Sequence, residues 1–134
     1  MSPEALIRRY YETFNHGDRA ALLDLLTEDV IHDLNQGSTE IGREAFQRFL
    51  ERMDQSYREQ VEDLHILTSP NHPQRAAAEF QISGTYHHTD SRLPPATGQR
   101  YRLPVGAFFE LTETHISRVT NYYNLQEWLR QISP

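Results

Sequence analysis

The sequence predicts an α+β domain in which helices come first and a run of strands follows. Apolar residues recur mainly at helical spacing up to Tyr57, then alternate with other residues from Gln60 to Tyr123, and a short helical pattern closes the chain. Helices followed by consecutive strands are typical of a fold in which helices cover one face of an antiparallel sheet.

The N-terminal part is predicted to hold three helices and one strand. The first helix begins at Ser2-Pro3-Glu4, which combines a capping residue, a proline and an acid in the first turn. It ends at Asn15-His16-Gly17-Asp18, which also caps the second helix. A short strand at Val30–Leu34 and a turn at Asn35-Gln36-Gly37 precede a third helix from about Arg43 to Tyr57.

The C-terminal part is predicted to form a sheet and one last helix. Turn-rich segments at Ser69–Pro73 and Leu93–Gly98 separate the alternating stretches. Asn124 and Glu127 have the spacing of a cap pair before a short helix that carries Trp128. The predicted strands are Gln60–Thr68, Arg75–His87, Arg100–Leu111 and Ile116–Tyr123.

Composition excludes several classes of protein. The chain has 134 residues, 13 Lys and Arg against 19 Asp and Glu, a net charge of -6 and no cysteine. One domain over residues 1–134 is therefore expected, and the charge argues against nucleic-acid binding. The absence of cysteine excludes disulfides and thiol chemistry. No apolar run could span a membrane and no signal peptide is seen, so a cytoplasmic protein is expected.

The stretch Arg100–Leu111 leaves the two faces of the sheet open to two interpretations. Its odd-numbered residues are all apolar, whereas its even-numbered residues are mixed. In the first interpretation the apolar row is the core beneath the helices, which periodicity alone favours. In the second, the mixed row lines a pocket beneath the helices and the apolar row is buried in a homodimer.

Several segments, in order and spacing, resemble the nuclear-transport-factor-2-like (NTF2-like) superfamily. The resemblance is closest to ketosteroid isomerases and SnoaL-type polyketide cyclases, and it covers nearly the whole chain. The segments that carry it are Arg9–Asp18, Thr27–Asp33, Ile41–Phe46, Thr97–Arg100, Phe108–Leu111 and Ile116–Ile132.

The resemblance implies a cystatin-like cone. In it a curved antiparallel sheet packs on three N-terminal helices around an apolar pocket, and a short helix follows. Gly84 and Gly106 would widen this pocket because they lack side chains. The expected lining residues are Phe49, Met53, Phe80, Ile82, Tyr86, Gly106, Phe108, Val119 and Tyr123.

The resemblance also implies proton abstraction next to the carbonyl of an apolar substrate. Counting back from Gly42 places Asp33 at the position of the isomerase base. Counting forward from Asp29 makes His32 face the pocket instead, because adjacent strand residues point to opposite faces. Tyr10 falls at the position of the tyrosine that donates to the enolate oxygen.

Two positions depart from the relatives. The second isomerase donor, a protonated aspartate, falls on Gly106, and Asn121 replaces an acid of the cyclases. An amide can orient a carbonyl group, but it cannot transfer a proton near neutral pH. We therefore assign Asn121 to substrate orientation in the predicted catalytic set of Asp33, His32, Tyr10 and Asn121.

The favoured function is a small-molecule isomerase or cyclase that needs no cofactor and no metal. The expected partners are an apolar small molecule and a second copy of the chain, bound through the outer face of the sheet. A non-catalytic ligand-binding module is the alternative, because one fold hosts both. An activity like that of epoxide hydrolases is less favoured, since no Asp–Arg–Asp set is evident.

Overall fold

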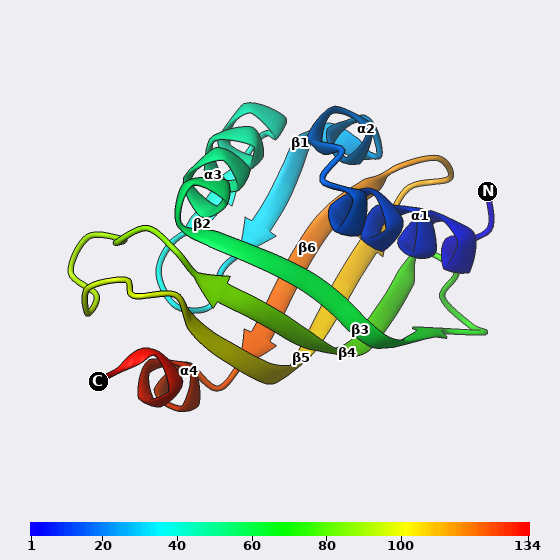
Figure 1. The fold of residues 1–134 in the computed structure, drawn as a ribbon. Coiled ribbons are helices and arrows are strands. Elements are labelled where there is room, and N and C mark those ends of the chain that lie inside the picture. Colours follow the sequence, from blue (N-terminus) through cyan, green and yellow to red (C-terminus); the bar gives the residue numbers. More distant parts are fainter.

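The computed structural model covers residues 1–134 and shows a curved six-stranded sheet with four helices (Figure 1). This confirms the predicted α+β fold with three N-terminal helices and a short C-terminal helix. The elements are α1 (Pro3–His16), α2 (Arg19–Asp24), β1 (Leu26–Asp33), β2 (Thr39–Ile41), α3 (Arg43–Ser56), β3 (Tyr57–Thr68), β4 (Arg75–Tyr86), β5 (Gln99–Leu111), β6 (Ile116–Tyr123) and α4 (Leu125–Ile132).

The strands lie in the order β2-β1-β6-β5-β4-β3. All neighbours are antiparallel except β1 and β6, which run parallel, so the prediction of a wholly antiparallel sheet is wrong at this one pair. The sequence also gives no sign of β2. Its three residues pair with the end of β1, and a strand so short carries no readable alternation.

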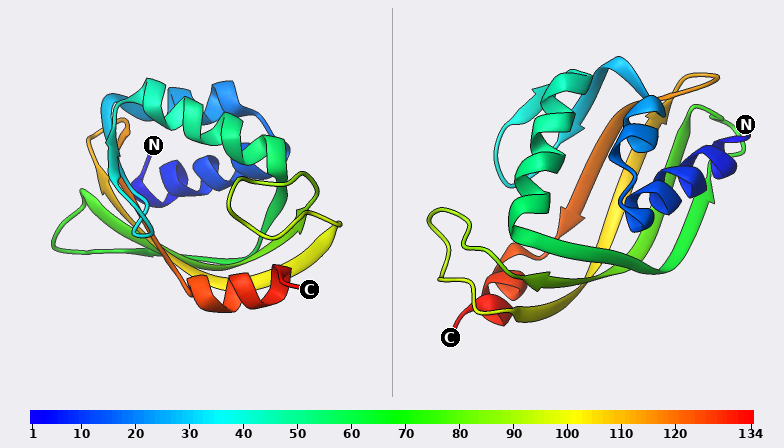
Figure 2. Two further views of the ribbon diagram at one scale, coloured as in Figure 1. Left: turned by 90° about the vertical axis from the view of Figure 1, so that its left-hand side faces the viewer. Right: turned by 45° about the horizontal axis from the view of Figure 1, so that its top comes forward.

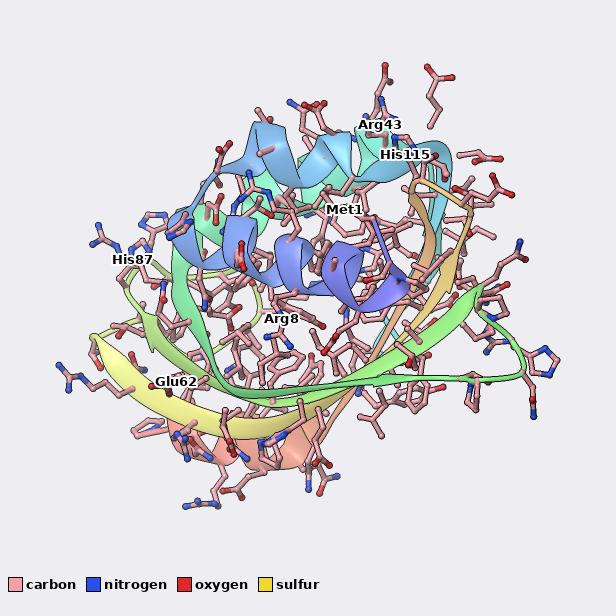
Figure 3. All side chains as sticks on the ribbon, turned by 90° about the vertical axis from the view of Figure 1, so that its right-hand side faces the viewer. Met1, Arg8, Arg43, Glu62, His87 and His115 are labelled. Carbon is pink, nitrogen blue, oxygen red and sulfur yellow. The ribbon has the colours of Figure 1, made fainter.

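The three N-terminal helices cover the concave side of the sheet, which we call the inner face (Figures 1 and 2). Side chains fill the space between these helices and the sheet (Figure 3). The opposite, convex side is called the outer face. No helix is long and apolar enough to cross a membrane.

Strand β5 decides between the two interpretations of the sheet faces. Its apolar row is the core, and Phe109 packs 5.7 Å, between ring centroids, from Tyr10 of α1. The interpretation that places this row on the outer face is wrong, because the helices cover the more apolar side of the sheet. The buried residues of the row are Tyr101, Leu103, Ala107, Phe109 and Leu111.

Helix α1 starts and stops where the sequence predicts. The Ser2 side chain accepts a hydrogen bond from the Ala5 amide at 3.1 Å, and Gly17 takes the left-handed conformation with a φ of 73°. Between these ends, Tyr10 and Tyr11 point from α1 toward the sheet, where Tyr11 lies 5.0 Å from Phe80. The caps therefore fix which face of α1 meets the core.

Helix α4 covers the part of β5 that extends beyond β6. The Gln131 side chain accepts a hydrogen bond from the Arg102 amide at 2.8 Å and donates one to the Arg102 carbonyl at 3.1 Å. These bonds satisfy backbone groups that would otherwise form an open sheet edge. Figure 2 (left) shows α4 across the sheet from the other three helices.

Candidate functional site

His32 lies on the inner face of β1, beneath α3. Its cross-strand neighbours are Glu40 of β2 and Val119 of β6. Its ring stacks on Phe46 at 4.4 Å between ring centroids and meets Phe49 edge-on at 4.7 Å. Leu26 and Val30 of β1 face the core, and every second residue of a strand points to the same face. His32 lies two residues after Val30, so its imidazole points into the protein.

The environment of His32 keeps its imidazole neutral. The residue is only 2% exposed, and burial lowers its pKa to about 4, against a smaller opposing effect of the Asp33 charge. Its Nδ1 atom is buried and has no hydrogen-bond partner. A buried polar atom without a partner in the protein is unusual, and its hydrogen bond is left for a ligand or a water molecule to satisfy.

Asp33 points to the outer face, away from the helices. Its carboxylate accepts hydrogen bonds from Thr39 at 2.9 Å, Thr120 at 2.8 Å and the Arg118 guanidinium at 2.7 Å. Burial alone would raise the pKa of Asp33, but these three partners outweigh it and leave the pKa below its usual value. The expectation that Asp33 faces the pocket is wrong, because β1 runs in the register that turns His32 inward.

Tyr10 and Asn121 both belong to the inner side of the sheet. The Tyr10 ring meets Tyr11 at 5.0 Å and Phe109 at 5.7 Å between centroids, and burial raises the pKa of its phenol. Asn121 stands opposite Ala107 in the same inner row as Val119. Its backbone carbonyl accepts a hydrogen bond from the Asn35 side chain at 2.7 Å. The structure therefore groups three of the four predicted catalytic residues on one side of the sheet.

Most of the predicted pocket lining lies on this inner side, but two residues do not. Gly106 and Phe108 belong to the outer row of β5, and Phe108 is 48% exposed against Tyr122, at 5.6 Å between centroids. Their expected place in the pocket is wrong, because it assumed that the mixed row faced inward. The inner residues are Phe49, Met53, Phe80, Ile82, Tyr86, Val119 and Tyr123.

Tyr86 serves the fold, because it is fully buried and holds the loop between β4 and β5. Its hydroxyl donates to the Pro94 carbonyl at 2.7 Å and accepts from the Asp90 amide at 2.9 Å. The neighbouring Tyr57 donates to the Asp90 carboxylate at 2.8 Å. These contacts account for Tyr86 in the inner row of β4, and no bound ligand is needed to explain its place there.

A hollow of the surface lies elsewhere, between the end of α1 and the strands β3, β4 and β5. We call this hollow, of about 920 Å³, the α1–β3 groove. Of the residues predicted to be catalytic or to shape the pocket, only Gly84 contributes to it. Its wall is formed by Phe14, Asn15, His16, Gly17, Arg19, Asp54, Tyr57, Arg58, Glu59, Gln60, Glu62, Ser83, Gly84, Thr85, Arg100 and Tyr101.

Glu59 and Tyr101 form a polar pair in this groove that sequence reasoning missed. The Tyr101 hydroxyl donates to Glu59 Oε2 at 2.5 Å across the intervening strand. Burial raises the pKa of Glu59, although Tyr101 and Arg19 act against it. An acidic residue in an otherwise apolar alternation, Tyr57-Glu59-Val61, was the available signal, but the predicted strand began only at Gln60.

Gly84 makes this pair possible. It lies between Glu59 and Tyr101 in the sheet, and a Cβ atom at Gly84 would overlap the Tyr101 ring. The sequence-based expectation that Gly84 widens an apolar pocket is therefore wrong. Tyr101 fills the space above Gly84 and uses it to reach Glu59.

No three side chains of the His, Cys, Asp or Glu types gather into a group that could hold a metal ion. The histidines next to each other in sequence, His87 and His88, both follow the last residue of β4. The inner side of the sheet offers a neutral imidazole, phenols and an amide, and the α1–β3 groove adds the half-buried carboxyl group of Glu59.

Comparisons with known proteins agree with this architecture. The family model of the SnoaL-like domain matches residues 7–119. A provisionally named polyketide cyclase of Xanthomonas campestris pv. campestris is 53% identical, with a TM-score of 0.95, over 98% of this chain and 96% of that one. One from Pseudomonas putida is 47% identical, with a TM-score of 0.96, over 99% of both chains.

A third provisionally named polyketide cyclase, from a Silicibacter species, is 43% identical, with a TM-score of 0.96, over 99% of this chain and 96% of that one. No curated protein sequence matches the chain. The family model spans most of the chain and the three structures cover nearly all of it at high identity. The protein is therefore a member of the SnoaL-like domain family within the NTF2-like fold.

Proposed function

We propose that this protein is a small-molecule cyclase or isomerase that moves a proton next to a carbonyl group, with His32 as the base. The observation that carries the proposal is the buried Nδ1 of His32, which has no partner in the protein. The similarity to three provisionally named polyketide cyclases supports the reaction class.

The imidazole of His32 is suited to accept a proton. With a pKa lowered to about 4, it is uncharged at neutral pH and has a free lone pair on one ring nitrogen. The flanking Phe46 and Phe49 rings favour an apolar substrate. Abstraction of a proton from carbon next to a carbonyl would leave an imidazolium ion and an enolate oxygen.

Tyr10 and Asn121 would act on the oxygen atoms of the substrate. Burial keeps the Tyr10 phenol protonated, and no group of the protein accepts its proton in a hydrogen bond, so it is free to donate to the enolate oxygen. The Asn121 amide on the neighbouring strand would orient the same carbonyl. This mechanism requires no cofactor.

A non-catalytic ligand-binding module is the second candidate. The observation that favours it is the closed packing around His32, which is 2% exposed and does not border the α1–β3 groove. Hydrolysis in the manner of epoxide hydrolases is not supported, because the Asp33, Arg118 and Glu110 cluster lies on the outer face.

The test uses a β,γ-unsaturated ketosteroid and follows the absorbance of the conjugated product. His32→Gln should lower kcat by about 10² to 10⁴-fold, since that is the usual contribution of a positioned base. Tyr10→Phe should lower kcat by a smaller factor. Asp33→Asn is the matched control on the adjacent residue and should keep the activity of the wild type, with folding checked by circular dichroism.

Turnover that survives in His32→Gln would refute the assignment of the base. A wild-type protein that binds the steroid saturably but does not convert it would favour the ligand-binding module instead.

A further inference from the structure

Glu40 of β2 lies directly opposite His32 of β1. Residues that face each other across an antiparallel pair point to the same side of the sheet, with Cβ atoms about 5 Å apart. The next pair of the same ladder shows this register on the outer face, where Thr39 donates a hydrogen bond to Asp33. The Glu40 side chain therefore starts from the inner face, beside the imidazole of His32.

Both residues of this pair carry a buried polar atom without a hydrogen-bond partner. In His32 the atom is Nδ1, and in Glu40 it is Oε1. Only four buried side-chain nitrogen or oxygen atoms of the chain lack a partner, and two of them belong to these opposed residues. A buried carboxylate oxygen is costly unless a donor or a positive charge compensates it. Glu40 thus keeps an acceptor that the resting protein does not use.

The second carboxylate oxygen of Glu40 has a weak partner. The Arg52 guanidinium lies 3.6 Å from Oε2, beyond the range of a hydrogen bond, and the Arg52 side chain is 58% exposed. Such a pair contributes little to stability, because water solvates the exposed charge. Arg52 also lies 5.9 Å from the centroid of the Phe49 ring, which meets His32 edge-on. Arg52 therefore offsets part of the Glu40 charge without satisfying the carboxylate.

The other elements packed against His32 bring no second carboxylate to the inner face. Asp33 points to the outer face, where Arg118 compensates its charge. Strand β6 places the apolar Val119 beside His32, and α3 covers the imidazole with two phenylalanine rings. Among these neighbours, Glu40 alone can pair with a positive charge that forms on His32.

We propose that Glu40 is a positioning residue that stabilises the imidazolium form of His32 during proton transfer. The inference rests on the proposed function, in which the substrate C–H bond breaks, its proton passes to Nδ1 of His32 and its electron pair moves to the enolate oxygen. A buried imidazolium ion is costly among apolar side chains, and a carboxylate on the neighbouring strand lowers that cost. Glu40 itself exchanges no proton with the substrate.

The first measurement is the pKa of His32, followed by nuclear magnetic resonance of the histidine side chains. The His32 signal is the one that is absent from His32→Gln. Glu40→Gln should lower this pKa by about 0.5–1, because the imidazolium loses its counter-charge. Arg52→Met should raise it by a similar amount, since the Glu40 charge is then no longer offset. Glu51→Gln, at an exposed acid of α3, is the matched control and should leave the pKa unchanged.

Steroid turnover is the second readout. Glu40→Gln should lower kcat by about two- to tenfold and leave KM nearly unchanged, because it weakens the base without touching the substrate. Arg52→Met should not lower kcat. Opposite shifts of the His32 pKa in the two variants cannot come from a general loss of structure. Arg52 is exposed, so its variant remains decisive if Glu40→Gln does not fold.

Two results would overturn the proposal. These are an unchanged His32 pKa in Glu40→Gln or Arg52→Met, and shifts of the same sign in both variants. The resonance measurement needs no turnover, so it separates this inference from the assignment of the base. Opposite pKa shifts in a protein that does not convert the steroid would support the pairing of Glu40 with His32 and refute the proposed reaction.

Discussion

His32 and Asp33 are neighbours in β1, yet the two faces of the sheet give them opposite surroundings. On the inner face His32 lies between two phenylalanine rings, with a ring nitrogen that has no partner. On the outer face Asp33 is bonded by two threonines and an arginine. His32 is thus isolated among aromatic rings, whereas the charge of Asp33 is compensated by its neighbours.

This difference matters for chemistry because a group that the fold has fully satisfied has nothing left to offer a ligand. The Asp33 carboxylate is used in holding β1, β2 and β6 together. His32 and Glu59, in contrast, keep unused hydrogen-bonding capacity at a cost in stability. Proteins commonly accept such a cost at functional sites.

The largest expected effect that tests the comparison is the pH dependence caused by His32. Its pKa is lowered from 6.5 in the unfolded chain to about 4 in the folded protein, so the unfolded state binds more protons between these values. Protonation of His32 therefore favours unfolding. Its contribution should lower the free energy of unfolding by roughly 3 kcal/mol as pH falls from 6.5 to 4. Urea denaturation at a series of pH values measures this loss.

The control for this prediction is His32→Phe, which preserves the aromatic packing and cannot titrate. The variant should lose less stability than the wild type over the same pH interval. Identical pH dependences of the two proteins would show that His32 is not desolvated as described.

A second prediction concerns Gly84, which separates Glu59 from Tyr101 on the inner face. Gly84→Ala should destabilise the protein by about 1–3 kcal/mol, because the new Cβ collides with the Tyr101 ring and breaks its bond to Glu59. Thermal denaturation gives the size of the effect. Gly37→Ala, at a turn with open space around it, should be nearly neutral.

The outer face offers the matching test at Arg118. Arg118→Met should cost about 1–2 kcal/mol at neutral pH, since Asp33 loses one charged partner but keeps two threonine hydroxyls. The pKa of Asp33 should rise toward its ordinary value. Because a lowered carboxyl pKa stabilises the folded state only above it, the deficit of the variant should shrink as Asp33 becomes protonated in acid.

The smallest expected effect concerns the exposed aromatic pair of the outer face. Phe108 and Tyr122 are 48% and 53% exposed, so Phe108→Ser should change monomer stability by no more than about 0.5 kcal/mol. A homodimer through the outer face stays a prediction. If the dimer forms, Phe108→Ser should shift its sedimentation toward that of the monomer. If the variant still sediments as a dimer, the dimer interface lies elsewhere.

The fold and the limits of most elements were predictable because the signals are local. The cap at Ser2, the turn at Gly17 and the alternation along β5 all depend on residues close in the chain, and each is found in the structure. The three-residue β2 was not predictable, since its pairing with β1 gives no periodic pattern. The parallel pairing of β1 and β6 was not predictable either, for the same reason.

The candidate site was predictable only in part, for a physical reason. The sequence by itself determined the residue types available, an imidazole, phenols and carboxylates without thiols, and it limited the base to His32 or Asp33. The tertiary structure alone decided between them, because a register shift of one residue exchanges the faces of a strand. It alone also brought Tyr101 across Gly84 to Glu59, since residues 42 positions apart meet only when the sheet is assembled.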